Sequence, residues 1–214
     1  MRSRSAIFLH AIGVVFLAMT ATAWATADSP IETIRTTIQQ ARAILENPEY
    51  QGQDHKTQRL AKVKEIVLPQ FDSQEVAKRT LSTYWKDLTE PQRQEFVDLF
   101  ITLVEKTYSH NLDRYNRNVQ FFYDHERIED QFSEVDTRVL DPVQNKTFSI
   151  VYRLHNVSGK WLVYDVVIEN VSMVQNYRNQ FNRILAKSSY EELIKTLQNK
   201  LHELDTASTS ETKG

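Results

Sequence analysis

The first half of the chain carries apolar residues at helical spacing. They recur every three or four positions in residues 31–45 and again in residues 60–67. Pro48 and Pro69 follow these two runs, and proline commonly marks the end of a helix. The pattern therefore predicts two short helices, separated by a polar loop.

Two further helices have explicit start signals. Asp72 and Glu75 stand in the spacing of a capping box, in which the first side chain accepts a hydrogen bond from the amide three residues on. Thr89 and Gln92 repeat this spacing, with Pro91 in the first turn. We expect helices over residues 72–88 and 90–115.

The helix predicted over residues 90–115 has an unusually wide apolar surface. At 100° per residue its apolar side chains cover an arc of about 220°, whereas one core requires a stripe of only about 100° or a little more. This helix is therefore expected to contact apolar material on two sides. It is either a central core helix between other elements, or a helix with one side lining a cavity.

From residue 118 the apolar period changes from helical spacing to two. Strands are predicted over residues 119–123, 135–140, 147–155 and 161–171, and the polar stretches at 124–126 and 129–130 are predicted to be solvated loop. Helices follow at 174–185 and 189–204, and the polar residues 205–214 are expected to be disordered. The expected architecture is one α+β domain over residues 28–204, with a helical part (30–115), a sheet (118–171) and closing helices (172–204).

The first 27 residues have the pattern of a secretory signal peptide. Arg2 and Arg4 precede an apolar stretch at residues 6–19, and small residues then offer cleavage after Ala25 or Ala27. Fourteen apolar residues fall short of the ~20 that span a bilayer. We therefore expect a cleaved, exported chain that has no stable membrane insertion.

Composition excludes several kinds of site. The chain has no cysteine, and only Gly52, Gly159 and Gly214 follow the leader, so thiol chemistry, a phosphate-binding glycine loop and a nucleophile elbow are excluded. No histidine pair has metal-ligand spacing, so no metal site is expected. The formal net charge of −2 gives no basic surface for nucleic acid.

The strand at 161–171 is almost entirely apolar but contains Asp165 and Glu169. A carboxylate in an apolar cleft acquires a raised pKa and is able to act as a general base. The alternative is a structural carboxylate paired with Arg153 or Arg178. Aromatic residues on the apolar faces of these elements are equally open to two uses, since large aromatics fill cores and also line ligand pockets.

Three stretches of the chain strongly resemble the MlaC-type, or toluene-tolerance, family. They are FDSQEVAKRTLSTYWKDLTEPQRQEFVDLF, LVEKTYSHNLDRY and YRLHNVSGKWLVYDVVIENVSMVQNYRNQF. WLVYDVVIENVS and the following NYRNQF are the most specific part, and the resemblance extends over roughly residues 31–204. Asn170 departs from the family pattern, because glycine is common at that position.

The resemblance implies a fold and a function. The fold would be an NTF2-like, four-stranded antiparallel sheet wrapped by helices around a deep apolar pocket. The function would be that of a soluble periplasmic phospholipid carrier, which moves lipid between an outer-membrane lipoprotein–porin complex and the substrate-binding ring of an inner-membrane ABC transporter. Such a carrier maintains the lipid asymmetry of the outer membrane. It is not an enzyme, and it uses no metal or cofactor beyond its bound phospholipid.

The resemblance also suggests which residues contact the lipid. Tyr164 and Arg178 are expected either at the pocket mouth or as links between strand and helix. The remaining candidates are apolar or aromatic, and they come from the long helix, the last strand and the helix after it: Val97, Phe100, Val104, Tyr108, Val166, Ile168, Val171, Val174 and Tyr177. Two other functions stay open, namely a protein-binding or chaperone-like periplasmic module and an NTF2-like enzyme with Asp165 as base.

Overall fold

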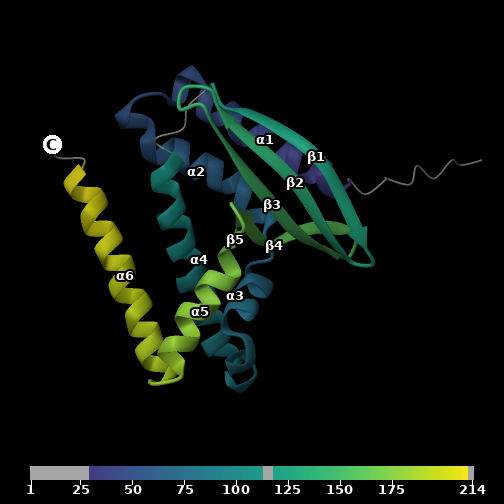
Figure 1. Ribbon diagram of the computed structural model, residues 1–214. Coiled ribbons are helices and arrows are strands. Elements are labelled where there is room, and N and C mark those ends of the chain that lie inside the picture. Colours follow the sequence, from purple (N-terminus) through teal and green to yellow (C-terminus); the bar gives the residue numbers. More distant parts are fainter. Residues whose placement is uncertain (1–28, 113–117, 212–214) are drawn as a thin grey trace, which may run out of the picture.

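The computed structural model describes residues 29–112 and 118–211, and the side chains of 110–112 and 208–211 are not part of that description (Figure 1). The predicted signal peptide and its cleavage site lie outside the described residues. Short 3-10 segments connect the first helices: η1 (Pro48–Tyr50), η2 (Gln53–His55), η3 (Leu68–Gln70) and η4 (Ser82–Asp87). The α-helices are α1 (Pro30–Glu46), α2 (Lys56–Val67), α3 (Ser73–Leu81), α4 (Glu90–Leu112), α5 (Met173–Leu185) and α6 (Tyr190–Glu211).

The strands form one antiparallel sheet in the order β1-β2-β3-β4-β5. This confirms the α+β prediction. The number of strands differs from the expected four, because the apolar run at 161–171 is divided between a long strand and a short return strand. The strands are β1 (Gln120–Glu129), β2 (Phe132–Asp141), β3 (Lys146–Val157), β4 (Lys160–Ile168) and β5 (Val171–Ser172).

A two-residue turn divides that run. Glu169 and Asn170 both have positive φ, 47° and 65°, which is the backbone of a tight hairpin turn whose twist matches the flanking strands. Asparagine tolerates this left-handed conformation better than most residues, so the turn forms without glycine. Glu169 also accepts a hydrogen bond from the Ser149 amide at 2.6 Å, which fixes the turn against β3.

β1 continues through the polar residues that were predicted to be loop. The charges at 124–129 are accommodated because they face partners on β2: Arg138 donates twice to Asp124, at 2.7 and 2.8 Å, and His125 lies 2.7 Å from Asp136. Cross-strand ion pairs of this kind support strand pairing. The expectation of a solvated loop was therefore wrong for residues 124–126 and 129, which belong to the edge strand, whereas Asp130 lies in the turn that follows.

The apolar residues gather into two clusters. The larger is built from α3, α4, α5 and α6, and α4 lies in its centre with Phe96 and Phe100 fully buried. The smaller lies where α1 covers one face of the sheet, with Ile34 against Val135, Leu154 and Val163. Phe71 packs against both clusters.

A β-bulge in β4 decides which of its residues face α1. Leu154 pairs with Val163, whereas the next residue of β3, Arg153, pairs with Asp165. The extra residue, Tyr164, shifts the alternation, so that Val163 and Val166 both join the α1 side. Asp165 is directed to the opposite face, which we call the outer face.

The last helix is longer than the sequence suggested. The polar residues from 205 onward were expected to be disordered, but α6 continues to Glu211. Lys106 of α4 forms an ion pair with Asp205, so the helix still contacts α4 one residue beyond Leu204, the last residue that packs on the helical cluster. The helical conformation continues from there through residues whose composition alone favours disorder.

The turn between β4 and β5 leads to a first prediction. Asn170→Gly should leave the free energy of unfolding within about 0.5 kcal/mol of the wild type, because glycine adopts positive φ without steric cost. Asn170→Val should lower it by about 1–2 kcal/mol, the cost of a left-handed conformation in a residue with a bulky side chain. Urea denaturation followed by circular dichroism measures both, and equal stability of the two variants would contradict the assigned turn.

Candidate functional site

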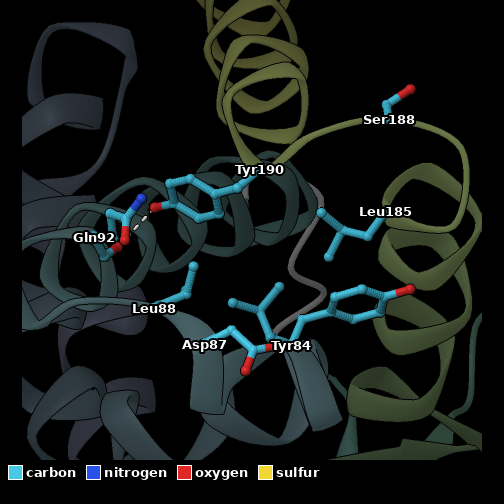
Figure 2. A pocket seen from close by; sticks show the side chains of 8 residues that line it. Tyr84, Asp87, Leu88, Gln92, Leu185, Ser188 and Tyr190 are labelled. Carbon is cyan, nitrogen blue, oxygen red and sulfur yellow. Dashed lines mark hydrogen bonds between the residues drawn. The ribbon is translucent and has the colours of Figure 1, made fainter.

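A small cavity lies at the end of the helical part, away from the predicted lipid site. Its volume is about 250 Å³, below the roughly 300–1,000 Å³ of ordinary ligand pockets. The Tyr190 hydroxyl, whose pKa is raised by burial, donates to the Gln92 carbonyl at 2.7 Å across it (Figure 2). None of the candidate lipid residues lines this cavity, which is formed by Leu81, Tyr84, Asp87, Leu88, Gln92, Leu185, Ser188 and Tyr190.

The elements that carry the predicted site are connected in a ring. α1 packs on β1 and β2 and also on α2. Lys64 of α2 forms an ion pair with Glu105 of α4 at 2.7 Å. Phe100 of α4 meets Tyr177 of α5 edge to face, with ring centroids 4.9 Å apart, and α5 packs back onto β4. We call the α1 face of the sheet and the accessible flanks of α4 and α5 the inner sides of this ring.

On the helical side of the ring, the candidates divide into buried and accessible residues. Val97, Phe100 and Val174 lie in the helical cluster and are at most 6% exposed. Val104 and Tyr177 lie at the edge of that cluster and are half-buried. The N-terminal half of α4 is therefore a central core helix, while its C-terminal half has accessible apolar side chains.

Tyr108 continues the accessible part of α4. It is 40% exposed, and burial of the remainder raises the pKa of its hydroxyl. Burial also raises the pKa of Tyr177; the nearby Tyr108 hydroxyl adds to this rise, whereas a hydrogen bond with Thr107 opposes it. The protein therefore partly shields both tyrosine hydroxyls from water.

On the sheet side, the candidates spread from the interior to one end of the sheet. Val166 is half-buried and packs against the cluster beneath α1. Ile168 and Val171 flank the β4–β5 turn and are 40% and 61% exposed. Val166 thus belongs to the interior of the ring, and the other two lie at its rim.

Tyr164 and Arg178 connect the sheet and α5 to α3 and do not face the α1 side. The Arg79 guanidinium of α3 lies over the Tyr164 ring, 4.0 Å from its centroid, and His155 meets the same ring edge to face. Arg178 donates from Nε to the carbonyl oxygen of Arg79 at 2.7 Å. Of the two roles considered for this pair, the geometry favours the link between strand and helix.

Asp165 is 3% exposed, and both of its carboxylate oxygens accept hydrogen bonds. Oδ2 accepts from Ser172 Oγ at 2.6 Å and from Arg153 Nη1 at 3.3 Å, and Oδ1 accepts from the Val174 amide at 3.0 Å. A general base requires an oxygen free to approach a substrate proton. This arrangement fits a structural carboxylate and does not fit a base.

Two residues of β3 that were not among the candidates also lie on the α1 face of the sheet. Tyr152 pairs with Val166 across the sheet and packs in the same cluster, and Ile150 pairs with Ile168. Burial raises the pKa of the Tyr152 hydroxyl, to which the nearby Tyr123 contributes, yet its side chain keeps accessible surface. The alternation of apolar residues at positions 148, 150, 152 and 154 was the available signal for this face.

Within residues 29–112 and 118–211, no helix has the length and hydropathy needed to cross a membrane. In the same part of the chain, no group of three or more His, Asp or Glu side chains is arranged to hold a metal ion.

Comparison with known proteins places the chain in a family. It is 27% identical over 139 residues to the intermembrane phospholipid transport system binding protein MlaC of Haemophilus influenzae, covering 64% of this chain and 65% of that protein. A solved phospholipid-binding protein from Ralstonia solanacearum, in complex with a phospholipid, shares the fold with a TM-score of 0.73 and 22% identity, covering 83% of this chain and 99% of the other. Residues 35–199 match the profile of the family described as MlaC protein, and the chain belongs to that family.

Proposed function

We propose that this chain is a phospholipid carrier that holds acyl chains between the α1 face of its sheet and the accessible flanks of α4 and α5. The observation that supports this most strongly is the presence of two separate apolar clusters within one ring of elements. The edge of each cluster carries half-buried apolar and aromatic side chains: Val104 and Tyr177 in the helical cluster, Tyr152 and Val166 beneath α1. Acyl chains between the two clusters would cover these side chains.

The partial exposure of Tyr152 supports this location. It lies on the central strand β3, in the cluster beneath α1, and its side chain is half-buried rather than fully buried. A half-buried aromatic side chain on this face offers apolar surface that a ligand would cover. Acyl chains gain about 0.8 kcal/mol for each CH₂ that leaves water, so chains of a dozen or more methylenes would be held firmly there.

The relatives support the class of ligand. The Haemophilus influenzae protein is named for intermembrane phospholipid transport, and the Ralstonia solanacearum structure contains a phospholipid. The aligned region spans 65% of the length of the Haemophilus influenzae relative, so the extension of its activity to this chain is part of the proposal. The shared fold and the ring of apolar walls together favour phospholipid over a protein client.

The finer proposal concerns the lipid's position and route. Tyr108, Ile168 and Val171, which are exposed, would form the mouth, and the headgroup would remain toward solvent there. The chain would be exported by its cleaved leader and act in the periplasm, where it would carry phospholipid between the outer-membrane lipoprotein–porin complex and the inner-membrane ABC transporter. This route rests on the family resemblance of the sequence.

The first test is native mass spectrometry of residues 28–214, purified from a bacterial periplasm without detergent. We expect a mass excess of one phospholipid, because the apolar walls would otherwise be exposed to water. Solvent extraction then identifies the lipid. A protein that is free of lipid and also takes up none from phospholipid vesicles would overturn the proposal and favour the protein-binding module.

Two substitutions on opposite faces of the sheet test the location. Val166→Glu should reduce retained phospholipid at least tenfold, since an unpaired carboxylate facing acyl chains costs several kcal/mol. Leu140→Glu is the matched control, because Leu140 is also half-buried and lies on the outer face of β2, away from Asp165 and α5.

Both variants should keep the far-ultraviolet circular dichroism spectrum of the wild type. The retained lipid is quantified after solvent extraction. Equal retention by the two variants would show that the α1 face of β4 is not the lipid-binding wall.

A further inference from the structure

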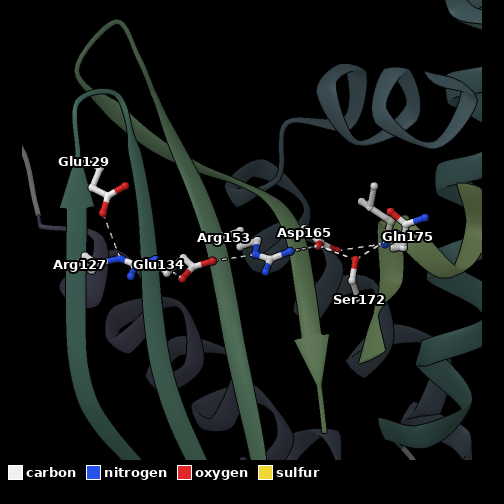
Figure 3. A network of polar contacts seen from close by, with 8 residues as sticks. Arg127, Glu129, Glu134, Arg153, Asp165, Ser172 and Gln175 are labelled. Carbon is white, nitrogen blue, oxygen red and sulfur yellow. Dashed lines mark hydrogen bonds and ion pairs between the residues drawn. The ribbon is translucent and has the colours of Figure 1, made fainter. Parts of the chain in front are cut away.

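The joint between the sheet and α5 is built on one buried carboxylate (Figure 3). Asp165, on the outer face of β4, accepts hydrogen bonds from the Ser172 hydroxyl and from the Val174 amide. Ser172 is the N-cap of α5, and its Oγ also accepts from the Gln175 amide at 3.0 Å. Two amides of the first turn of α5, which a helix cannot satisfy internally, are therefore bound by the Asp165–Ser172 pair.

The charge of Asp165 strengthens this joint. A carboxylate at a helix N-terminus interacts favourably with the helix dipole, and hydrogen bonds to an ionised acceptor are stronger than neutral ones. Arg153 holds the carboxylate from the sheet side, and Arg153 is itself bound by Glu134 of β2 at 2.9 Å. Arg127 of β1 continues the chain of polar contacts to Glu134 at 2.8 Å. The network thus runs from the edge strand to the first turn of α5.

The joint also connects the two proposed walls of the lipid site. Val166 follows Asp165 directly and belongs to the sheet wall. On the other side, α5 carries Val174 and Tyr177, and Tyr177 packs on Phe100 of α4. Because the Asp165–Ser172 pair fixes the start of α5 against β4, it fixes the separation of these walls.

We propose that Asp165 is a positioning residue which, through Ser172 and the Val174 amide, keeps the sheet wall and the α5 wall closed on the bound phospholipid. This inference rests on the proposed carrier function. Acyl chains leave only when the walls separate, and separation at this place requires that the Asp165 contacts to α5 break. Weakening these contacts should therefore accelerate lipid release even where the free energy of unfolding changes little.

The test measures transfer of pyrene-labelled phosphatidylethanolamine from loaded protein to vesicles of phosphatidylethanolamine and phosphatidylglycerol. Asp165→Asn keeps the shape of the side chain but removes its charge and one acceptor, and we expect release to accelerate about tenfold, the effect of weakening one charged hydrogen bond. Asp124→Asn is the matched control. Asp124 is a surface carboxylate on β1 that pairs with Arg138 of β2, away from α5. The release rate of this variant should stay within about twofold of the wild type.

Ser172 supplies a second variant in case Asp165→Asn does not fold. Ser172→Ala should also accelerate release about tenfold, and Ser172→Thr, which retains the hydroxyl, should restore the wild-type rate. Thr89→Ala removes a cap from α4 and controls for the loss of any helix cap. It should lower the unfolding temperature as Ser172→Ala does, without accelerating release.

The outcomes separate this inference from the proposed function. A wild-type protein that takes up no labelled phospholipid overturns the carrier function and the positioning role with it. A wild-type protein that carries lipid, with Ser172→Ala releasing it no faster than Thr89→Ala, overturns the positioning role alone. Faster release that is specific to the Asp165 and Ser172 variants, together with faster hydrogen exchange at the Val174 and Gln175 amides, supports it.

Discussion

The sheet has an apolar face that one helix does not cover, and the rest of the structure follows from this constraint. α1 seals the part around Val135, Leu154 and Val163, leaving Ile150 and Val166 half-buried and Ile168 exposed. Apolar surface of this kind is unfavourable in water unless it is covered. The ring through α2, α4 and α5 carries further half-buried apolar surface, at Val104 and Tyr177, and the proposed ligand would cover both surfaces.

The opposite face of the sheet is held by charge. On β1 to β3 it carries cross-strand ion pairs, including Arg138 with Asp124 and Arg127 with Glu134, in exposed positions where each contributes little to stability. These polar contacts continue across the sheet to Asp165, which is buried. A hydrogen bond in such a buried position contributes more to stability than one at the surface. The two faces therefore have different roles, since one presents apolar walls and the other connects the sheet to the helices.

The helical part supplies a rigid support for this arrangement. Phe96, Phe100, Tyr177 and Phe181 form an aromatic cluster between α4 and α5, with ring centroids 4.9–5.7 Å apart. Such pairs fix the relative orientation of two helices as well as burying area. Full burial gives Phe100 the role of a core residue, so that Val104 and Tyr177 are the side chains of this region with surface available to a ligand.

The sequence by itself determined most of the helices and strands and their apolar faces. Periodicity and capping signals located the helices, although the one expected over residues 72–88 ends at Leu81 and continues as a 3-10 segment. The Asp72 cap is present, with Oδ1 accepting from the Glu75 amide. Local spacing carries this information because residues that share a face follow from helix and strand geometry alone. The strength of the apolar run in β4 likewise indicated a strand with an unusual environment.

The tertiary structure alone decided what covers each face. The bulge at Tyr164 placed Val166 on the α1 side and Asp165 on the outer side, and it arises from pairing with β3 rather than from β4 itself. The turn at Asn170 also depends on a contact with a distant residue, the Ser149 amide of β3. The C-terminal part of α6 contacts Lys106 of α4 through Asp205. Periodicity shows which side chains lie together, whereas their partner is set by contacts between residues far apart in the chain.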